Sequence, residues 1–348
     1  IDLPHWRLIR ILFSQFFPFL NGGRIAGDFS AGAVAQLDLI DTEDERPNLI
    51  TPTETLTNIS REPDAITWIG RNLLATADEG DLFGGSRGFT IFHKNGDRRF
   101  EIGNAFEHLT MSIGHYPDRR SDAKGSEPEG IVYCRFGGTK YLFVGSERAS
   151  VVGVYKVSGG AGNPDVEFVQ VLPTGLGPEG LLCIPQRNLF IVASEEDSRE
   201  DKFRAGLLIY QLQEGPPTYP TIKSDDDSGA PIPWGALSAL AADPDTSDVM
   251  YTVYDSFYAK SRIFTIDLTG DLPTISGQLV IKDPDGLLPS EFTVHGDSSV
   301  NLDPEGLAVS PVTGNFWVAS EGSGTVGDLT RPFETPNVLC EVDAAGDI

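Results

Sequence analysis

The chain has 348 residues, of which 51 are acidic and 26 basic, so its formal net charge is −25. A nucleic acid partner requires a basic surface, and this balance argues against one. Apolar residues make up 40% of the chain, which is enough for a sizeable core, and 38 Gly with 24 Pro favour many short strands over long helices. Such acidity suits a secreted protein or one that holds cations, and a merely solubilising surface is the alternative.

The first 30 residues receive no assigned element. Residues 8–20, LIRILFSQFFPFL, are apolar but carry Arg10, Ser14, Gln15 and Pro18. They fit a signal remnant, a non-native or amphipathic lead-in, or a partial first strand. No run of about 18 uninterrupted apolar residues occurs, so no membrane span is expected. We expect a single β domain over residues 31–348, cut at both ends from a longer chain.

One pattern recurs along this domain. Residues 32–41, GAVAQLDLID, resemble the tail of a unit. Readable copies then begin at Glu62 (EPDAITWIGRNLLATADEG), Glu127 (EPEGIVYCRFGGTKYLFVGSER), Leu176 (LGPEGLLCIPQRNLFIVASEED), Trp234 (WGALSALAADPDTSDVMYTVYDS) and Asp303 (DPEGLAVSPVTGNFWVASEG). Each copy has a turn with an acid, an apolar strand, a polar turn, and a second strand ending in small and acidic residues. The Trp234 copy has lost the first acid. A third strand usually follows, such as SVVGVYKV.

The spacing of the copies predicts an all-β fold of the β-propeller type. The first acid recurs after 65 residues from Asp64 to Glu129, and after 50 residues from Glu129 to Glu179. Units of this length with three or four strands fit propeller blades with insertions, of which five and part of a sixth are readable. A β-sandwich is the alternative, but it would not require the same acid at the same place in every unit.

Propeller geometry would bring the acids together. The first strand of a blade lines the channel and the second returns antiparallel, so the start of one and the end of the other meet at one mouth. The first acids are Asp64, Glu129, Glu179 and Glu305, and the second set is Asp78, Glu79, Glu147, Glu195, Asp255 and Glu321. Crowded carboxylates raise one another's pKa unless a cation lies among them. Oxygen ligands suit Ca²⁺, with Mg²⁺ or Mn²⁺ behind it; turn-capping acids are the alternative.

The three cysteines give little support to zinc binding or thiol catalysis, because no CxxC or His-paired spacing occurs. Cys134 and Cys183 fall in apolar runs and are interpreted as small core residues. No GxSxG or HExxH motif is present, which argues against a serine hydrolase or a zinc protease.

Two families resemble this sequence at the quoted motifs. REPDAITWIG, FEHLTMSIGHYPDRRSDAKGSEPEGI and YLFVGSERASVVGVY resemble the choice-of-anchor I family of bacterial secreted or surface propellers. LSALAADPDTSDVMYTVYDS and LDPEGLAVSPVTGNFWVASEG are similar to the phytase-like, esterase-like domain. The resemblance spans about residues 60–345. It implies a propeller with seven blades when complete, and a calcium-dependent phosphoric ester hydrolase akin to propeller phytases and alkaline phosphatases.

If the protein hydrolyses phosphoesters, its acidic and basic residues have distinct expected roles. Glu129, Glu179 and Glu305 are the expected catalytic metal ligands, with Asp64, Glu79, Glu147, Glu195 and Glu321 completing the metal set. Basic residues in loops expected over the same mouth would hold phosphate oxygens: His115, Arg119, Arg120, Lys124, Arg148 and Arg87. A solvated loop that balances local acid is the alternative for this basic segment.

Two other functions remain open. A non-catalytic surface module would use calcium as a staple and its loops to bind a partner, and a lactonase-type propeller enzyme would use channel acids with one calcium. The expected partner is a phosphorylated small molecule or a surface glycan, bound by a monomer. Calcium at extracellular levels, an acidic surface and few cysteines favour an extracellular, periplasmic or cell-surface location.

Overall fold

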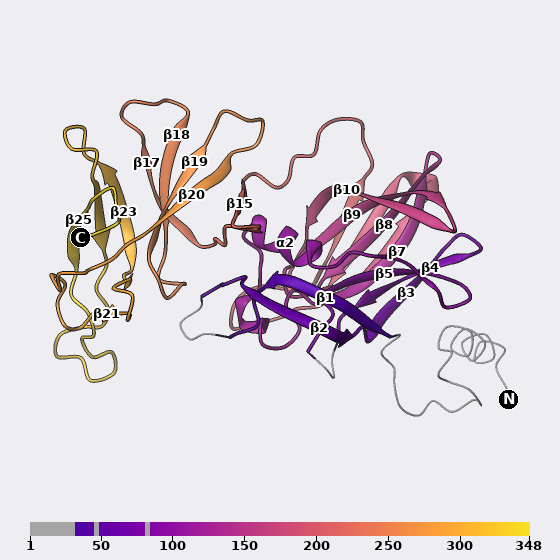
Figure 1. The fold of residues 1–348 in the computed structure, drawn as a ribbon, viewed down its shortest axis with the longest axis horizontal. Coiled ribbons are helices and arrows are strands. Elements are labelled where there is room, and N and C mark those ends of the chain that lie inside the picture. Colours follow the sequence, from indigo (N-terminus) through magenta and orange to yellow (C-terminus); the bar gives the residue numbers. More distant parts are fainter. Residues whose placement is uncertain (1–31, 45–48, 81–83) are drawn as a thin grey trace. The chain divides into compact units, whose positions relative to one another are not determined.

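The computed structural model describes residues 32–44, 49–80 and 84–348, and β-strands dominate them (Figure 1). The all-β prediction is therefore confirmed. The described chain divides into two compact units. Of the described residues, the first unit comprises 32–43, 52–80, 84–110 and 115–220, and the second comprises 44, 49–51, 111–114 and 221–348. The lead-in expected over residues 1–30 lies outside the described residues. Among the described residues, no helix is long and apolar enough to cross a membrane.

The first unit contains three antiparallel sheets whose strands follow one another in chain order, and a two-stranded ribbon. The ribbon pairs β1 (Ala33–Ile40) with β2 (Glu54–Ser60). The sheets are formed by β3 (Pro63–Ile69), β4 (Leu73–Asp78), β5 (Gly88–His93) and β6 (Arg98–Glu101); by β7 (Pro128–Phe136), β8 (Thr139–Ser146), β9 (Val151–Gly160) and β10 (Asn163–Pro173); and by β11 (Pro178–Ile184), β12 (Leu189–Ser194) and β13 (Gly206–Gln211). Short helices are α2 (Ala105–Ser112), η1 (Asp118–Arg120) and η2 (Pro185–Arg187).

The second unit repeats this design with two larger sheets and two short ribbons. One sheet holds β17 (Leu237–Ala242), β18 (Val249–Tyr254), β19 (Arg262–Asp267) and β20 (Thr274–Val280), with β14 (Lys223–Ser224) added in parallel to β20. The other holds β23 (Pro304–Val309), β24 (Phe316–Ser320) and β25 (Val338–Val342). The ribbons pair β15 (Asp226–Asp227) with β16 (Ala230–Pro231), and β21 (Thr293–Val294) with β22 (Val300–Asn301). Five meandering sheets thus coincide with the five repeats read from the sequence.

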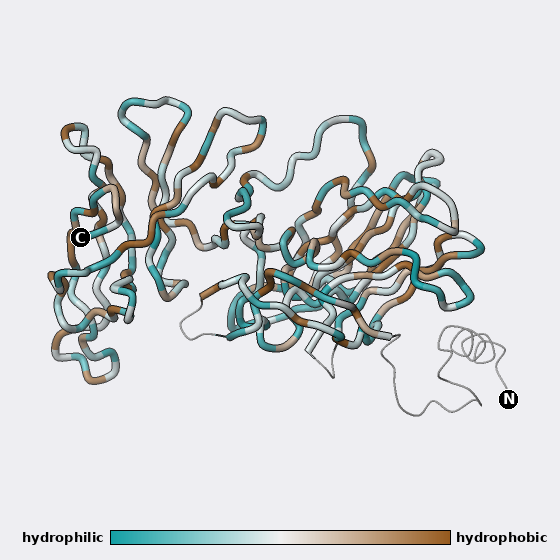
Figure 2. The backbone as a smooth tube through the Cα atoms, in the orientation of Figure 1, coloured by the Kyte–Doolittle hydropathy of each residue, from teal (hydrophilic) through white to brown (hydrophobic). Residues whose placement is uncertain are grey.

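Consecutive sheets pack face to face through apolar side chains. In the first unit, Ala75 and Ile91 of one sheet share a core with Leu142 and Val144 of the next. Strands covered on both faces, such as β4 and β8, are therefore buried over almost consecutive residues rather than alternating ones. Figure 2 shows the same distribution, with hydrophobic segments in the strands and hydrophilic ones in many loops. The first strands of neighbouring sheets lie together, β7 against both β3 and β11.

A β-bulge marks the first acid of each acid-bearing repeat. The strand register shifts between the residues that flank Asp64, Glu129, Glu179 and Glu305. A bulge takes one residue out of the pairing ladder and changes the direction of its side chain. In the Trp234 repeat, the shift lies between Leu237 and Leu240, and Ser238 stands where the acid was lost.

The second acids end at the same edge as the first. The Glu147 N–H donates to Glu127 O at 3.0 Å, and the Glu321 N–H donates to Asp303 O at 2.8 Å. Each accepting carbonyl lies two residues before the first acid of its repeat. The antiparallel return therefore brings the two acids of a repeat to one end of the sheet, as predicted.

A disulfide joins two sheets of the first unit. Cys134 of β7 and Cys183 of β11 are bonded, with Cα atoms 6.2 Å apart. Their interpretation as plain core residues is corrected: Cys134 is buried in the core, but the sulfur atoms form an intersheet bond between residues 49 apart. Spacing could not reveal the pair because the two cysteines become neighbours only when the sheets pack. Cys340 is a free, buried thiol.

We expect the Cys134→Ser/Cys183→Ser variant to lose about 4 kcal/mol of unfolding free energy, since a link across 49 residues restricts the unfolded chain. Urea denaturation measures this loss. A reductant should lower the urea midpoint of the parent and leave that of the double variant unchanged. Equal midpoints for parent and variant would contradict the bond.

Candidate functional site

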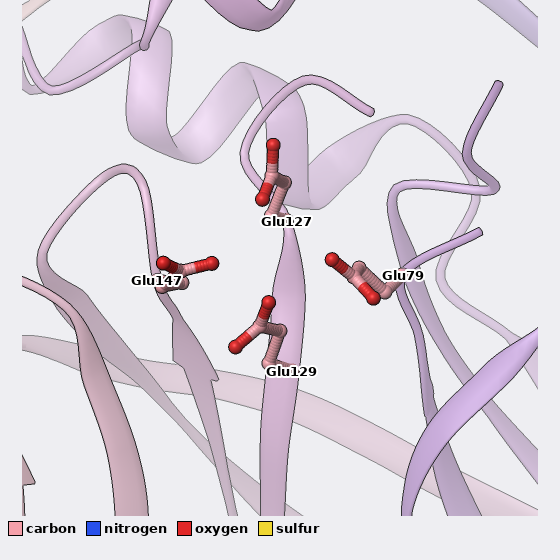
Figure 3. Close-up of side chains that lie close together, drawn as sticks. All are labelled: Glu79, Glu127, Glu129 and Glu147. Carbon is pink, nitrogen blue, oxygen red and sulfur yellow. The ribbon is translucent and has the colours of Figure 1, made fainter. Parts of the chain in front are cut away.

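Four glutamates of the first unit converge at the ends of two neighbouring sheets (Figure 3). Glu79, Glu127, Glu129 and Glu147 each offer a carboxylate oxygen, and these oxygens all lie within 4.8 Å of one another. We call these four residues the carboxylate cluster. Glu79 follows β4, Glu147 follows β8, and Glu127 and Glu129 lie before and within β7. Hard oxygen donors at this density fit a divalent cation such as Ca²⁺.

A left-handed residue and a bulge bring two neighbouring acids to the same centre. Glu129 is the bulged residue of β7, and Glu127 lies just before that strand. Glu127 adopts a left-handed φ of +50° directly before Pro128, a conformation that is sparsely populated for residues other than glycine. Its side chain is fully buried. The surrounding contacts therefore hold this glutamate against its backbone preference.

Three basic side chains surround the cluster. Lys124 forms ion pairs with Glu79 and, at 3.8 Å, with Glu127. Arg120 pairs with Glu127. Arg148 contacts Glu127 at 3.2 Å and Glu147 at 2.9 Å. The structure thus brings three of the basic residues predicted to bind phosphate onto the carboxylates, where they offset three of the four negative charges.

Glu129 is the member of the cluster for which, within the described part of the chain, no lysine or arginine forms an ion pair. Burial, followed by the carboxyl groups of Glu147 and Glu79 beside it, raises the pKa of Glu129 to about 10. Burial likewise raises the pKa of Glu147. Burial acts to lower the pKa of Arg148, but Glu147 and Glu127 outweigh it and raise that pKa. At neutral pH, the metal-free cluster therefore retains a proton at Glu129.

First acids from three sheets line one cleft. Asp64, Glu129 and Glu179 border a cavity of about 370 Å³ together with backbone and apolar atoms of β3, β7 and β11. Gly130 allows this approach, because a Cβ atom there would lie 3.0 Å from the Glu179 carbonyl oxygen. Burial and the nearby Glu195 and Asp64 raise the pKa of Glu179. Glu195 itself meets Glu147 and Glu196 in a second group of close carboxylates.

The second unit contains its own group of acids. Asp255, Asp303 and Glu305 offer oxygens within 4.8 Å of one another. Burial and a hydrogen bond with Asp255 raise the pKa of Asp303. Glu321 is exposed at the end of β24. Glu305 is therefore placed with two aspartates of its own unit.

Three further residues predicted to bind substrate have different surroundings. Arg119 is exposed in η1. His115 Nδ1 lies 2.8 Å from the Ala149 carbonyl, which only accepts, so Nδ1 carries a proton and Nε2 faces the Tyr219 hydroxyl. Both ring nitrogens of His115 are thus engaged. Arg87 is 1% exposed and hydrogen-bonded inside the protein, which removes it from contact with a substrate.

Sequence reasoning missed Glu127, Glu196 and Asp303. Glu127 and Asp303 are the opening letters of the EPEG and DPEG motifs, two residues before the first acids. The i, i+2 spacing alone does not predict a shared direction, because Glu127 is left-handed and Glu129 lies on a bulge. Asp78, by contrast, was grouped with the acids but is buried beside Thr76 and Thr90, and burial raises its pKa to about 7.

Comparison with known families gives two partial matches. The phytase-like model, described as esterase-like activity of phytase, matches residues 232–348, and the choice-of-anchor I domain matches residues 82–160. These are the families identified from the motifs, so that recognition is confirmed over these residues. The carboxylate cluster falls mostly in the second match, and Asp255, Asp303 and Glu305 fall in the first. No curated protein matches the chain.

Solved structures show only distant similarity. The hydrazine synthase of Kuenenia stuttgartiensis is 12% identical with a TM-score of 0.27, over 82% of this chain and 66% of that one. Raptor of Chaetomium thermophilum is 13% identical with a TM-score of 0.27, over 90% and 22%. Sqt1 of the same organism is 14% identical with a TM-score of 0.29, over 88% and 66%. The chain thus spans under two thirds of each, and such scores carry no argument about fold or function.

The raised pKa of Glu129 predicts how pH affects the metal-free protein. Because its folded pKa of about 10 exceeds its ordinary value of 4.5, its stabilising contribution is complete below pH 4.5 and is lost as pH rises toward 10. We expect the melting temperature in chelator to fall between about pH 6 and pH 9. Glu129→Gln, which cannot ionise, should show a smaller fall.

Differential scanning calorimetry across this range makes the measurement. Glu167→Gln is a matched control, because Glu167 lies on β10 in an exposed ion pair with Lys156. Its pH profile should follow that of the parent. Identical profiles for Glu129→Gln and the parent would show that Glu129 is ionised in the metal-free protein.

Proposed function

We propose that this protein is an exported, calcium-dependent phosphoric ester hydrolase built on a β-propeller. The observation that carries the proposal is the meeting of four carboxylates with Arg120, Lys124 and Arg148 at one end of neighbouring sheets. Oxygen ligands for a cation and positive groups for a phosphate are thereby within reach of each other. The phytase-like match at residues 232–348 supports the reaction class.

The propeller is supported by the repeated sheets. Each readable repeat forms one meander, and its first strand packs against a neighbouring first strand within its unit. In the four repeats that keep the first acid, that acid lies on a bulge at the same end. Blades arranged around a channel have these properties. We extend this architecture to residues 31–348 as one domain.

The cation would be held by Glu79, Glu129 and Glu147, with Glu127 facing the same centre. With all four carboxylates ionised, the cluster carries four negative charges and the three basic side chains carry three positive ones. One negative charge is therefore left without a basic partner, and a cation can offset it. When bound, a divalent ion would polarise a phosphoryl oxygen and lower the pKa of a water molecule. Asp64, Glu179 and Glu195 around the cleft, and Glu305 and Glu321 in the second unit, complete the proposed set of metal ligands. Among the ligands of the first unit we assign the catalytic roles to Glu129 and Glu179, and Glu305 takes the corresponding role at the group of acids in its own unit.

Side-chain exposure separates the basic residues that can contact a phosphate from those that act as counter-ions or orient a segment. The side chains of Arg148 and Arg120 are 38% and 35% exposed, so each can present N–H donors to a phosphate while it keeps a carboxylate partner. Arg119 is exposed beside them. Lys124 is mostly buried and acts chiefly as a counter-ion. His115 orients the segment at Ala149, next to Arg148, through its hydrogen bond.

A second function is a non-catalytic surface module stapled by calcium. The observation in its favour is that Glu127 is fully buried and paired with three cations, as expected of a closed structural network. Such a module would bind a surface glycan or protein and hydrolyse no phosphoester. Metal content and phosphatase activity distinguish the two functions.

Export is supported by chemistry as well as by the choice-of-anchor I match. A disulfide persists in oxidising compartments, and millimolar calcium saturates sites of moderate affinity outside the cytosol. We therefore place the protein outside the cell, in the periplasm or at the cell surface, as a monomer acting on a phosphorylated small molecule.

We expect the purified protein to contain calcium and to lose thermal stability when a chelator removes it, because the carboxylate cluster then loses its bound charge. Elemental analysis and melting curves with and without EGTA measure this. Calcium-loaded protein should hydrolyse p-nitrophenyl phosphate, and the chelated protein should not. Calcium without hydrolysis would favour the surface module, and an unchanged melting temperature after verified removal would refute the cation site.

Two substitutions separate metal binding from phosphate binding. Glu179→Gln keeps the side-chain volume but removes a negative charge, so it should lower calcium affinity and activity together. Arg148→Ala should leave calcium bound and raise KM by roughly tenfold, because a charge-assisted hydrogen bond to phosphate is lost. Arg135→Ala is the matched control, since Arg135 is exposed near the far end of β7. Unchanged kinetics in Arg148→Ala would remove that residue from the substrate site.

A further inference from the structure

A buried ion pair lies beneath the loop that leads to the carboxylate cluster. Arg87 is 1% exposed and Glu107, in α2, is fully buried; Arg87 Nη1 lies 3.3 Å from Glu107 Oε2. Taking two charges out of water is costly, and a well-packed apolar pair is often as stable. Unlike apolar side chains, however, this ion pair can form hydrogen bonds to the backbone of neighbouring segments.

The pair fixes both ends of residues 121–126. Arg87 Nη2 donates to the Ser121 carbonyl at 2.5 Å, and the Ser126 N–H donates to Glu107 Oε1 at 2.8 Å. The segment between them carries Lys124, and Glu127 follows directly. Gly125 is required in it, because its φ is +58° and a Cβ atom would lie 2.4 Å from Glu107 Oε2.

The same pair connects to the other side of the cluster. Arg87 ends the loop after Glu79, and the Ser86 hydroxyl donates to the Asp78 carbonyl at 3.0 Å. Gly85 of this loop packs on Lys124, where a Cβ atom would lie 2.8 Å from the Lys124 Cα. The loop from β4 and the loop before β7 therefore meet at Arg87 and Lys124.

We propose that Arg87 and Glu107 are positioning residues that set the geometry of the carboxylate cluster for its cation. The inference rests on the proposed cation site and deepens it. Neither residue belongs to the carboxylate cluster; the pair acts through Ser121 and Ser126 on Lys124 and Glu127. Groups that hold metal ligands in place commonly contribute about 10- to 100-fold to metal affinity.

Terbium(III), a luminescent substitute for calcium, tests the proposal on the full chain. Glu107→Gln keeps the volume and an oxygen for the Ser126 N–H but removes the charge facing Arg87. We expect its terbium affinity to fall at least about tenfold. Luminescence lifetimes in H₂O and D₂O should show at least one additional water on the ion. Arg87→Lys, which cannot bridge Ser121 and Glu107 in the same way, should change in the same direction.

A control separates positioning from general stability. Glu101→Gln removes the β6 carboxylate that pairs at 2.9 Å with buried Arg61, and it leaves the bonds of Arg87 to Ser121 and of Glu107 to Ser126 in place. It should lower the melting temperature while terbium affinity and bound water stay at the parent values. If Glu107→Gln does not fold, Thr110→Val replaces it, because it removes the 2.7 Å contact with the Ser126 hydroxyl and the 2.9 Å hydrogen bond to the Glu107 carbonyl while keeping the Glu107 carboxylate. The expected loss of affinity is then smaller but accompanied by the same change in bound water.

The possible outcomes distinguish the proposed cation site from the positioning role of Arg87 and Glu107. A parent that binds terbium, with Glu107→Gln unchanged in affinity and hydration, overturns the positioning role alone. A parent that binds neither terbium nor calcium overturns the proposed cation site and the positioning role with it. Equal losses of affinity in Glu101→Gln and Glu107→Gln would also overturn the role, because they would trace the effect to stability.

Discussion

Electrostatic repulsion among four carboxylates is the constraint on which this site depends. Oxygens of Glu79, Glu127, Glu129 and Glu147 lie within 4.8 Å of one another in a partly buried environment. Three basic side chains offset three charges, and the remaining group, Glu129, has a pKa raised to about 10. A proton and a divalent cation can therefore satisfy the same position.

The backbone makes this crowding repeatable. A bulge takes the first acid of a repeat out of the strand ladder, and at Gly130 the missing side chain lets the neighbouring first strand β11 approach. The second acid arrives at the same edge because its strand returns antiparallel. This rule produces Glu129 with Glu147 in the first unit. In the second unit, Glu305 lies instead with Asp303 and with Asp255, the second acid of the preceding repeat. Ser238 shows that a sheet can keep the bulge without the acid.

A reaction of any kind at this site needs its loops held still. The segment 121–126 has no regular strand, yet both of its ends are bonded to buried charged groups. Such anchoring differs from surface ion pairing, which contributes little in water. It also explains why Arg87 lies in the interior of an acidic protein: its two terminal nitrogens connect segments that are distant in sequence.

The sequence by itself determined the strands, the five repeats and the edge at which their acids lie, because strand alternation and antiparallel return are local properties of the chain. It also placed Arg120, Lys124 and Arg148 near those acids, through loops directly joined to the acid-bearing strands. Only the tertiary structure decided that Arg87 is buried, that Cys134 bonds Cys183, and that Glu127 joins the cluster. These three outcomes depend on which sheets and loops pack together, and packing between segments 20 to 50 residues apart leaves no periodic signal in the sequence.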